Sequence, residues 1–254
     1  MNVPPSTPSS RARAATAPRL VDAAEARPIL GRSDVRSRAG GGTVGSAIQF
    51  MAKRLIDLTI SLLLLIVLAP LFVVIMVAVW VSSPGPVIYR SMRIGLGAHR
   101  FGCLKFRTMR QGAEAMQPQL EQHNQAEGAV FKIENDPRVT AVGRWLRSSG
   151  LDELPQLINV LRGQMSLVGP RPLPLRDCSL LPVAAWRRHS VVPGISGPWQ
   201  LNPNRHADEQ LLAQLDLAYV DHWSLLVDLR VVAGTVWFGV RRLFTIDSEL
   251  AANG

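Results

Sequence analysis

The chain contains one long apolar run, residues 58–81, which reads LTISLLLLIVLAPLFVVIMVAVWV and has no charged side chain. A helix that crosses a bilayer needs about 20 such residues, so the run is long enough to span a membrane. Pro70 lies in its middle, where a proline removes a hydrogen bond and kinks a helix. The arm formed by residues 55–69 is roughly 22 Å long at the helical rise per residue. That arm is shorter than the hydrocarbon core, which is about 30 Å thick.

Basic side chains lie on both sides of this run. Lys53 and Arg54 precede it, and Arg90, Arg93 and Arg100 follow it. Lys and Arg collect on the cytoplasmic side of membrane segments. Both ends are therefore expected on the cytoplasmic face, which favours a re-entrant helix that enters the bilayer, bends at the proline and returns. A straight span is the alternative that the length of the run leaves open.

Charge and cysteine content predict a reducing environment and partners that carry phosphate. The 254 residues include 28 Lys and Arg against 19 Asp and Glu, a formal net charge of +9. This balance suits nucleic acid, anionic lipid or a nucleotide substrate, without choosing among them. The two cysteines, Cys103 and Cys178, have no His or Cys at metal-ligand spacing. They are expected to be reduced thiols packed in the interior of a cytoplasmic domain.

The apolar run divides the chain into three parts. Residues 1–48 are rich in Arg, Ser, Pro and Gly without apolar periodicity, which predicts a disordered tail. Residues 49–83 are the membrane segment, a helix, a break and a second helix. Residues 84–247 are expected to form a compact cytosolic α/β domain. The predicted fold class is mostly α with short β segments, with a re-entrant membrane helix and amphipathic interfacial helices.

The third part shows recognisable local signals. Short strands are expected in residues 87–95 and 99–109, a helix that ends at Gly150, and a second helix over 151–163. Apolar residues recur at helical spacing from Leu225 onward, with tryptophans that suit a membrane interface. Packing of this last helix against a protein core is the alternative.

Two adjacent acids, Asp152 and Glu153, stand near the start of the segment LDELPQLINVLRGQMSLVGPRP. Acids in the first turn of a helix complement its dipole, and Pro155 also fits a first turn, so a structural role would explain the pair. A carboxylate can instead attack phosphorus, or hold a Mg²⁺ ion that binds phosphate oxygens. Adjacent helical residues point about 100° apart, so the two acids are expected to perform different tasks.

Basic residues around the acidic pair suggest an anion site. Lys105 and Arg107 lie in the segment KFRTM, and Arg147 precedes the acids. Arg171 lies between two prolines, in a backbone that is partly locked. A rigid guanidinium binds phosphate with two parallel hydrogen bonds. Each residue alone is explained as a solvated charge, but together they predict a site for a phosphate-bearing substrate.

Five segments, in order, resemble the motifs of the bacterial sugar transferase family, the monotopic polyprenyl-phosphate phosphoglycosyl transferases. They are KRLIDLTISLLLLIVLAPLF, SPGPVIYRSMRIG, KFRTM, LDELPQLINVLRGQMSLVGPRP and PGISGPWQ, and the match extends from about Lys53 to about Arg242. The resemblance implies transfer of a sugar phosphate from a UDP- or GDP-linked sugar to undecaprenyl phosphate. The products are a polyprenyl-diphosphate-sugar and UMP or GMP, in the initiating step of exopolysaccharide, capsule, O-antigen or glycan synthesis.

The resemblance also implies roles for single residues. Asp152 is the nucleophile that forms a covalent phosphosugar intermediate, and it is a ligand of the Mg²⁺ cofactor. Glu153 assists, as a general base toward the lipid phosphate. Arg147 and Arg171 resemble the phosphate-binding residues of the family, and Lys105 is a further candidate.

The resemblance has consequences for topology and contains three departures. Pro70 corresponds to the break of a re-entrant helix, with the catalytic domain on the cytoplasmic face of the bacterial inner membrane. Ala69 stands where the family often has Ser, which bears on how the bend is supported. Val192 replaces a frequent basic residue, and Gly150 a bulkier one. The family's larger members carry further transmembrane helices upstream, so the expected type is the short form.

The expected partners are undecaprenyl phosphate, a nucleotide sugar and membrane lipid, without nucleic acid, and a homodimer is possible. The alternative is a non-catalytic adaptor, anchored in the membrane, whose basic domain binds anionic lipid or nucleic acid. Charge and the apolar run would suffice for an adaptor. It would leave the acidic pair and the order of the motifs without a purpose.

Overall fold

The computed structural model describes residues 44–120, 133, 136–179, 181–202 and 209–252. The tail expected for residues 1–48 lies outside these ranges as far as residue 43. The polar stretch after residue 111 is described only in part, with a short helix, α5 (Gln117–Leu120).

The apolar run forms two helices that meet at a sharp angle. Helix α3 (Val44–Val67) begins five residues before the membrane boundary expected at 49, and α4 (Ala69–Ser82) follows after a single residue. The two axes differ by 64°. Pro70 lies in the first turn of α4, where its missing N–H breaks no helical bond. Among the described helices none is long and apolar enough to span a bilayer alone, whereas this bent pair has the length and composition to insert.

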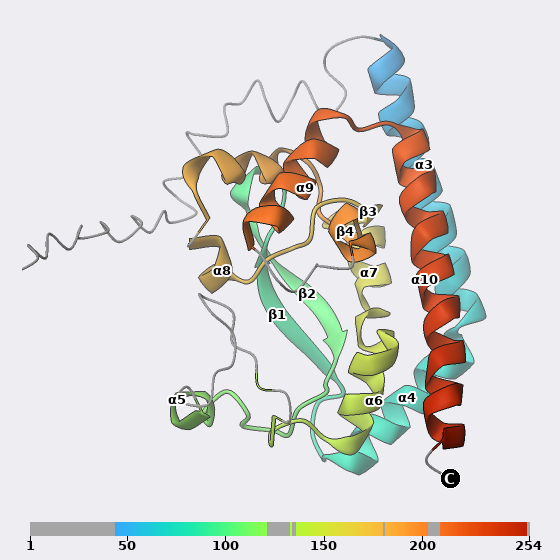
Figure 1. The fold of residues 1–254 in the computed structure, drawn as a ribbon, viewed down its shortest axis with the longest axis vertical. Helices are drawn as coiled ribbons and strands as arrows, with labels where there is room; N and C mark the ends of the chain where they lie inside the picture. The colour runs from blue at the N-terminus through green and yellow to red at the C-terminus, as the bar shows by residue number, and fades with distance from the viewer. Residues whose placement is uncertain (1–43, 121–132, 134–135, 180, 203–208, 253–254) are drawn as a thin grey trace, which may run out of the picture.

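A β-hairpin follows the bent pair and confirms the two expected strands. Strand β1 (Ile88–Ile94) pairs antiparallel with β2 (Arg100–Phe106), so that Tyr89 faces Lys105 and Arg93 faces Phe101. The turn between the strands contains a short 3₁₀ helix, η2 (Leu96–Ala98). Figure 1 shows the hairpin in the middle of the molecule, with α7 between it and the long helices α3 and α10.

The acidic pair occupies a 3₁₀ turn of its own. Helix α6 (Ala141–Ser149) is capped by the Thr140 hydroxyl, which accepts from the Gly143 N–H, and ends at Gly150, whose φ of 76° is left-handed. The turn η4 (Leu151–Glu153) comes next, and α7 (Gln156–Leu161) begins only after it. The continuous helix expected over 151–163 is therefore wrong in its first part, because the acids precede α7.

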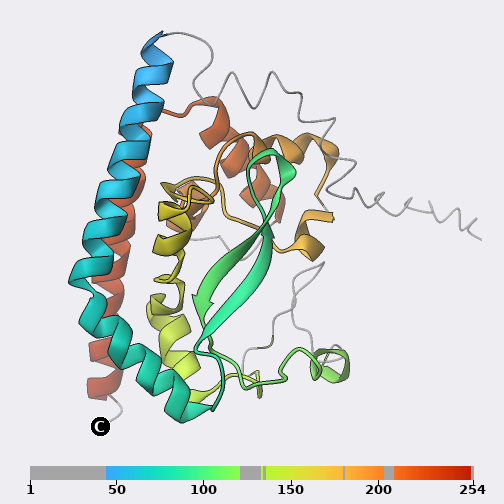
Figure 2. The ribbon, with the colours of Figure 1, turned by 180° about the vertical axis from the view of Figure 1, so that it is seen from behind.

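The C-terminal half wraps around the hairpin and returns along α3. A two-stranded parallel sheet joins β3 (Ser166–Val168) to β4 (Gly194–Ser196), which the sequence analysis did not anticipate. Figure 2 shows α10 on the same side of the molecule as α3, seen from behind. The remaining elements are α8 (Leu175–Ser179), η5 (Val183–Ser190), η6 (Pro198–Leu201), α9 (Glu209–Asp221) and α10 (Leu225–Ala252).

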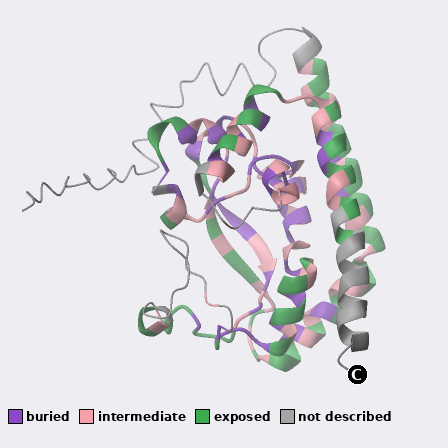
Figure 3. Cartoon of the chain, viewed as in Figure 1, coloured by how far each residue is buried: buried purple, intermediate pink, exposed green. Residues whose placement is uncertain are grey.

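The two halves of the bent pair meet the rest of the protein differently. One face of α4 is buried, because Ile75 and Val79 pack with Phe106 and Leu146 in a common apolar cluster. The outer faces of α3, α4 and α10 stay exposed, as Figure 3 shows for α3. Large apolar side chains lie on those faces, among them Leu55, Leu62, Leu63, Ile66, Val73, Val77, Trp80, Leu229, Val236 and Trp237. Core packing of the last helix, the alternative considered above, does not apply to these α10 residues.

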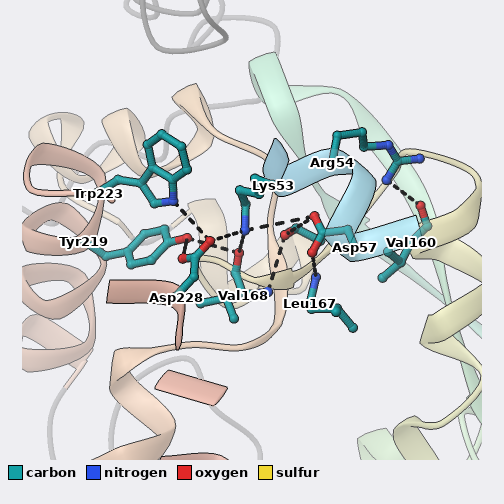
Figure 4. Close-up of polar contacts among 10 residues, drawn as sticks. Lys53, Arg54, Asp57, Val160, Leu167, Val168, Tyr219, Trp223 and Asp228 are labelled. Carbon is teal, nitrogen blue, oxygen red and sulfur yellow. Dashed lines mark hydrogen bonds and ion pairs between the residues drawn. The ribbon is translucent and has the colours of Figure 1, made fainter. Parts of the chain in front are cut away.

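Polar side chains fasten the N-terminal half of α3 to the domain (Figure 4). The Lys53 ammonium donates to the Asp228 carboxylate of α10 at 2.6 Å and to the Val168 carbonyl at 3.1 Å. Asp228 also accepts from the Tyr219 hydroxyl at 2.7 Å and the Trp223 indole at 3.2 Å. Lys53 is thus part of an internal network of hydrogen bonds, whereas its position in the sequence indicated only the topology of the apolar run.

Two further residues of α3 extend this network. The Asp57 carboxylate, which is buried, accepts from the Ser166 hydroxyl at 2.7 Å and from the Leu167 N–H at 3.1 Å. The Arg54 guanidinium donates to the carbonyls of Val160 and Leu161, at 2.8 and 3.2 Å. These carbonyls belong to the last turn of α7, and that of Val160 also accepts from the Gly163 N–H at 2.9 Å. We call the set Lys53, Asp57, Ser166, Tyr219 and Asp228 the α3 latch.

Candidate active site

The acidic pair faces the second strand of the hairpin. The Lys105 ammonium lies 2.6 Å from the nearer Glu153 oxygen and 3.9 Å from an Asp152 oxygen. Lys105 comes from β2, whereas both acids come from η4, which the left-handed Gly150 turns out of the axis of α6. The hairpin and the α6–α7 junction thus bring together residues that are 47 and 48 positions apart, as the sequence analysis expected for a common site.

The environment shifts the pKa values of the two carboxyl groups in opposite directions. Burial raises the pKa of Asp152, and the positive charges of Lys105 and Arg147 only partly offset this effect. Burial alone would also raise the pKa of Glu153, but Lys105 and Arg171 outweigh it and the pKa is lowered. Two neighbouring carboxyl groups whose pKa values differ in this way commonly have different chemical roles. Glu153 is therefore the more acidic of the two carboxyl groups, and Asp152 is the more basic.

A positively charged pocket opens beside Glu153. Three cationic side chains, Arg93, Lys105 and Arg171, surround it, so the single carboxylate of its lining is outnumbered. A surplus of donors without a full set of protein anions suits a ligand that carries several negative charges. The other lining residues are Cys103, Gln156, Pro172, Gly194 and Ile195.

Arg171 reaches this pocket from the segment between β3 and α8. Its guanidinium lies over the ring of Trp199, with the central carbon 4.3 Å from the ring centroid. Such stacking restrains a guanidinium without using its N–H groups. Arg171 is thus held flat on one side while its donors remain available in the plane.

The other two predicted basic residues lie elsewhere. Arg147, on α6, donates from Nε to the Thr108 hydroxyl at 2.8 Å, and its charge acts on Asp152 from outside the pocket lining. Arg107 donates to the carbonyls of Ser83 and Pro84, just after α4. Arg107 therefore ties the end of the bent pair to β2, and the structure does not bring it to the pocket.

Sequence reasoning missed Arg93 as a residue of the site. It took the side chain only as a basic flank of the apolar run, yet Arg93 lines the pocket. The alternation along the hairpin carried the signal, since the register places Arg93 on the same face as Cys103 and Lys105. Gln156, the first residue of α7, was missed because the helix had been taken as continuous from residue 151, which gave its side chain a different direction.

The acidic pair could hold a magnesium ion only if the phosphates of a substrate supplied further oxygen ligands. Among the described residues no group of three or more His, Cys, Asp or Glu side chains is close enough to enclose a metal. Magnesium is commonly held by one or two carboxylates together with waters and substrate phosphates, so this is the expected donor set. The Asp152 carboxylate is the better ligand, because the nearer Glu153 oxygen is engaged by Lys105 at 2.6 Å.

The two cysteines are packing residues, as predicted. Both are free thiols and about 1% exposed. Burial raises the pKa of Cys178 to about 12. Its sulfur lies 3.9 Å from Nε2 of His189, a neighbour that the sequence spacing did not reveal. The pKa of His189 is itself lowered to about 3 by burial and by Arg188.

Comparison with known proteins assigns the chain to a family. Residues 48–242 match the family model described as bacterial sugar transferase. The exopolysaccharide production protein ExoY of Sinorhizobium fredii is 40% identical over 190 residues, which cover 73% of this chain and 84% of the relative. The undecaprenyl-phosphate galactose phosphotransferase of Salmonella typhimurium is 36% identical over 194 residues, covering 75% and 40%. The UDP-glucose:undecaprenyl-phosphate glucose-1-phosphate transferase of Escherichia coli is 38% identical over 202 residues, covering 76% and 41%. This chain belongs to the bacterial sugar transferase family.

Proposed function

We propose that this sugar transferase is a phosphoglycosyl transferase that moves a sugar phosphate from a nucleotide sugar to undecaprenyl phosphate. The names of its relatives support the acceptor and the class of donor, since they include glucose and galactose phosphotransferases that act on undecaprenyl phosphate. The reaction would be an initiating step of polysaccharide assembly. UDP-glucose and UDP-galactose are the donors to test first.

The observation that carries the proposal is the juxtaposition of Asp152 with a cationic pocket. A diphosphate needs several fixed positive charges, and Lys105, Arg171 and Arg93 line one pocket. A nucleophile must lie within reach of the phosphorus, and Asp152 lies 3.9 Å from the ammonium of Lys105. Both features are packed against the bent apolar pair through the cluster of Phe106 and Leu146.

The proposed chemistry has two displacements at one phosphorus. An Asp152 oxygen forms a bond to the phosphorus next to the sugar, and the bond from that phosphorus to the bridging oxygen breaks, so that a nucleoside monophosphate leaves. An oxygen of the lipid phosphate then attacks the same phosphorus and releases the carboxylate. Glu153 accepts the proton of the lipid phosphate if that group arrives protonated. Lys105 and Arg171 stabilise the charge that moves onto the phosphate oxygens.

Magnesium is proposed as the cofactor, on the fit described above. Asp152 would hold it together with the phosphates of the donor. When bound, the ion supplies positive charge that neutralises the diphosphate. Lys105 keeps Glu153 oriented in either case, because their contact of 2.6 Å lies within the protein.

The bent pair is proposed to be a re-entrant membrane element with both ends on the cytoplasmic face. The 64° angle at Leu68, the exposed apolar surfaces of both helices and the attachment of α3 through the latch support this topology. It would bring a lipid phosphate at the membrane surface and a soluble nucleotide sugar to one pocket. Carbohydrate assembly would then begin on the cytoplasmic face of the bacterial inner membrane.

The test separates the first displacement from the second. The purified full chain is incubated with sugar-labelled UDP-glucose or UDP-galactose and Mg²⁺ in the absence of lipid, and label on the protein is mapped by mass spectrometry. Label is expected on Asp152, and Asp152→Asn should take up none, because an amide cannot form the acyl phosphate. Glu114→Gln, which changes an exposed carboxylate outside the pocket, should label as the parent does.

Two results would overturn the proposal. One is label on a residue other than Asp152, and the other is normal turnover by Asp152→Asn. If neither label nor turnover appears with any UDP- or GDP-sugar, the non-catalytic adaptor becomes the better account. Glu153→Gln is expected to keep some label while it loses transfer to lipid.

A further inference from the structure

The backbone around Arg171 is held in an unusual way. Pro170 and Pro172 have no N–H, so this segment offers the protein mainly carbonyl groups for attachment. Each of the three carbonyls accepts a hydrogen bond from a different part of the chain. The Gly194 N–H donates to Pro170 at 2.9 Å, Arg188 donates to Arg171 at 2.7 Å, and Arg93 donates to Pro172 at 3.2 Å.

Arg188 is the most deeply buried of these donors. Its side chain is 1% exposed and forms an ion pair with Asp216 of α9, which is not exposed at all. Within the described part of the chain, Nε and Nη1 of Arg188 and one oxygen of Asp216 have no hydrogen-bond partner. Burial of two charges is costly, and an incompletely bonded pair recovers only part of that cost. Net stabilisation therefore does not explain why a charged pair occupies this place.

The geometry offers another reason for the pair. The same nitrogen of Arg188, Nη2, donates to the Asp216 carboxylate and to the Arg171 carbonyl. Because Asp216 holds this guanidinium in place, the guanidinium in turn fixes the position of the Pro-Arg-Pro backbone. The guanidinium of Arg171 is already restrained by Trp199 at the other end of the residue. With both ends fixed, little conformational freedom is lost when the guanidinium binds an anion.

We propose that Arg188, backed by Asp216, is a positioning residue that holds the Pro-Arg-Pro segment so that Arg171 presents its guanidinium to a diphosphate in the pocket. The inference rests on the proposed function for the identity of the ligand. It assigns a role in anion binding to a buried residue that does not line the pocket. Arg188 acts through Arg171 and touches no substrate.

The chain contains a matched control for this idea. Arg187, the neighbour of Arg188 on η5, also pairs with an aspartate of α9, Asp221. That pair is partly exposed, and none of the hydrogen bonds between described residues joins Arg187 to Arg171. Arg187→Gln and Arg188→Gln therefore remove the same charge and the same kind of link between the same two elements. Only the second change removes the donor to the Arg171 carbonyl.

The experiment measures binding of inorganic pyrophosphate to the full chain in detergent by calorimetry, without Mg²⁺ and without any transfer step. Arg188→Gln should weaken binding about tenfold, the effect of one lost charge-assisted hydrogen bond. In an Arg171→Ala background the same change should alter affinity less than twofold, because the residue through which it acts is absent. Arg187→Gln should also alter affinity less than twofold. Arg188→Lys keeps the charge but not the planar fork, and should show an intermediate loss.

Thermal unfolding of each variant distinguishes positioning from folding. If Arg188→Gln does not unfold cooperatively, Arg188→Lys carries the test. The proposal is overturned if a folded Arg188 variant binds pyrophosphate as tightly as the parent, if the loss is the same in the Arg171→Ala background, or if Arg187→Gln causes an equal loss. Absence of pyrophosphate binding by the parent would overturn it too. Coupled binding without label on Asp152 would instead leave this inference standing and refute the proposed function.

Discussion

Removal of the Asp57 carboxylate should loosen the attachment of α3 to the rest of the domain. The residue is 4% exposed, and its carboxylate accepts from the Ser166 hydroxyl and the Leu167 N–H. Each hydrogen bond to a charged group contributes about 1.5–3 kcal/mol, so Asp57→Ala should cost about 3–5 kcal/mol. Asp57→Asn keeps the shape and one acceptor, and should cost about 2 kcal/mol, since its NH₂ group must face one of the two donors.

Thermal unfolding in detergent measures this loss. For a domain of this size 1 kcal/mol corresponds to about 2–4 °C, so Asp57→Ala should lower the midpoint by about 10 °C and Asp57→Asn by about 5 °C. Thr59→Ala, an exposed change two residues further along α3, should shift it by less than about 2 °C. A shift for Asp57→Ala as small as that for Thr59→Ala would show that the α3 latch does not hold the helix, and would refute the reasoning.

Three other outcomes are expected. His189 stays neutral in the folded protein down to a pKa of about 3, whereas unfolded His takes up a proton below about pH 6.5. The free energy of unfolding therefore decreases as the pH falls through this window. Between pH 6.5 and 5 the free energy of unfolding of His189→Gln should rise by about 2 kcal/mol relative to that of the parent. A difference between the two proteins that does not change with pH would contradict the burial argument. Gly143→Ala places a methyl group 2.0 Å from the Thr108 carbonyl oxygen and should cost about 3 kcal/mol in the same assay, and an unchanged midpoint would contradict that packing. Cysteines placed at Gln49 and Gln111 should both resist an impermeant thiol reagent applied to intact cells, and labelling of Gln49→Cys alone would establish a full span.

The sequence predicted those features whose cause is local. Pro70 locates the bend because a proline cannot continue the preceding helix α3 but fits the first turn of α4, and Gly150 ends α6 because it adopts the left-handed conformation. The two strands were predicted from two short segments with interleaved basic residues, but their pairing as a hairpin was not. The approach of Lys105 and Arg171 to the acidic pair was predicted from their residue types, and the resemblance to a family whose motifs are spaced far apart added their roles as phosphate-binding residues.

The features that the sequence did not reveal depend on contacts between distant segments. Arg188 and Asp216 lie in two different helices, and both are buried. A charged residue is usually exposed, so nothing in the local sequence of either helix indicated this burial. Arg107 stood in a motif beside Lys105 and was assigned to the same site, yet β2 ends at Phe106, so Arg107 lies beyond the strand and its side chain does not follow the face that carries Lys105. Its guanidinium accordingly reaches the end of α4 instead of the pocket. The acidic pair was predicted to lie in the same helix as residues 156–161, because the turn that separates it from α7 has no distinct sequence signal.

The contact between Lys53 and Asp228 has a consequence for the order of synthesis. The two residues are 175 positions apart, so Lys53 leaves the ribosome long before its partner exists. At about 5–20 residues per second the delay is roughly 10–35 s. During this interval Lys53 has only Asp57, four residues later, as an acidic partner, and under the proposed re-entrant topology its positive charge would keep this flank of the apolar run in the cytoplasm. Once translation reaches α10, the same ammonium becomes the anchor of the finished domain.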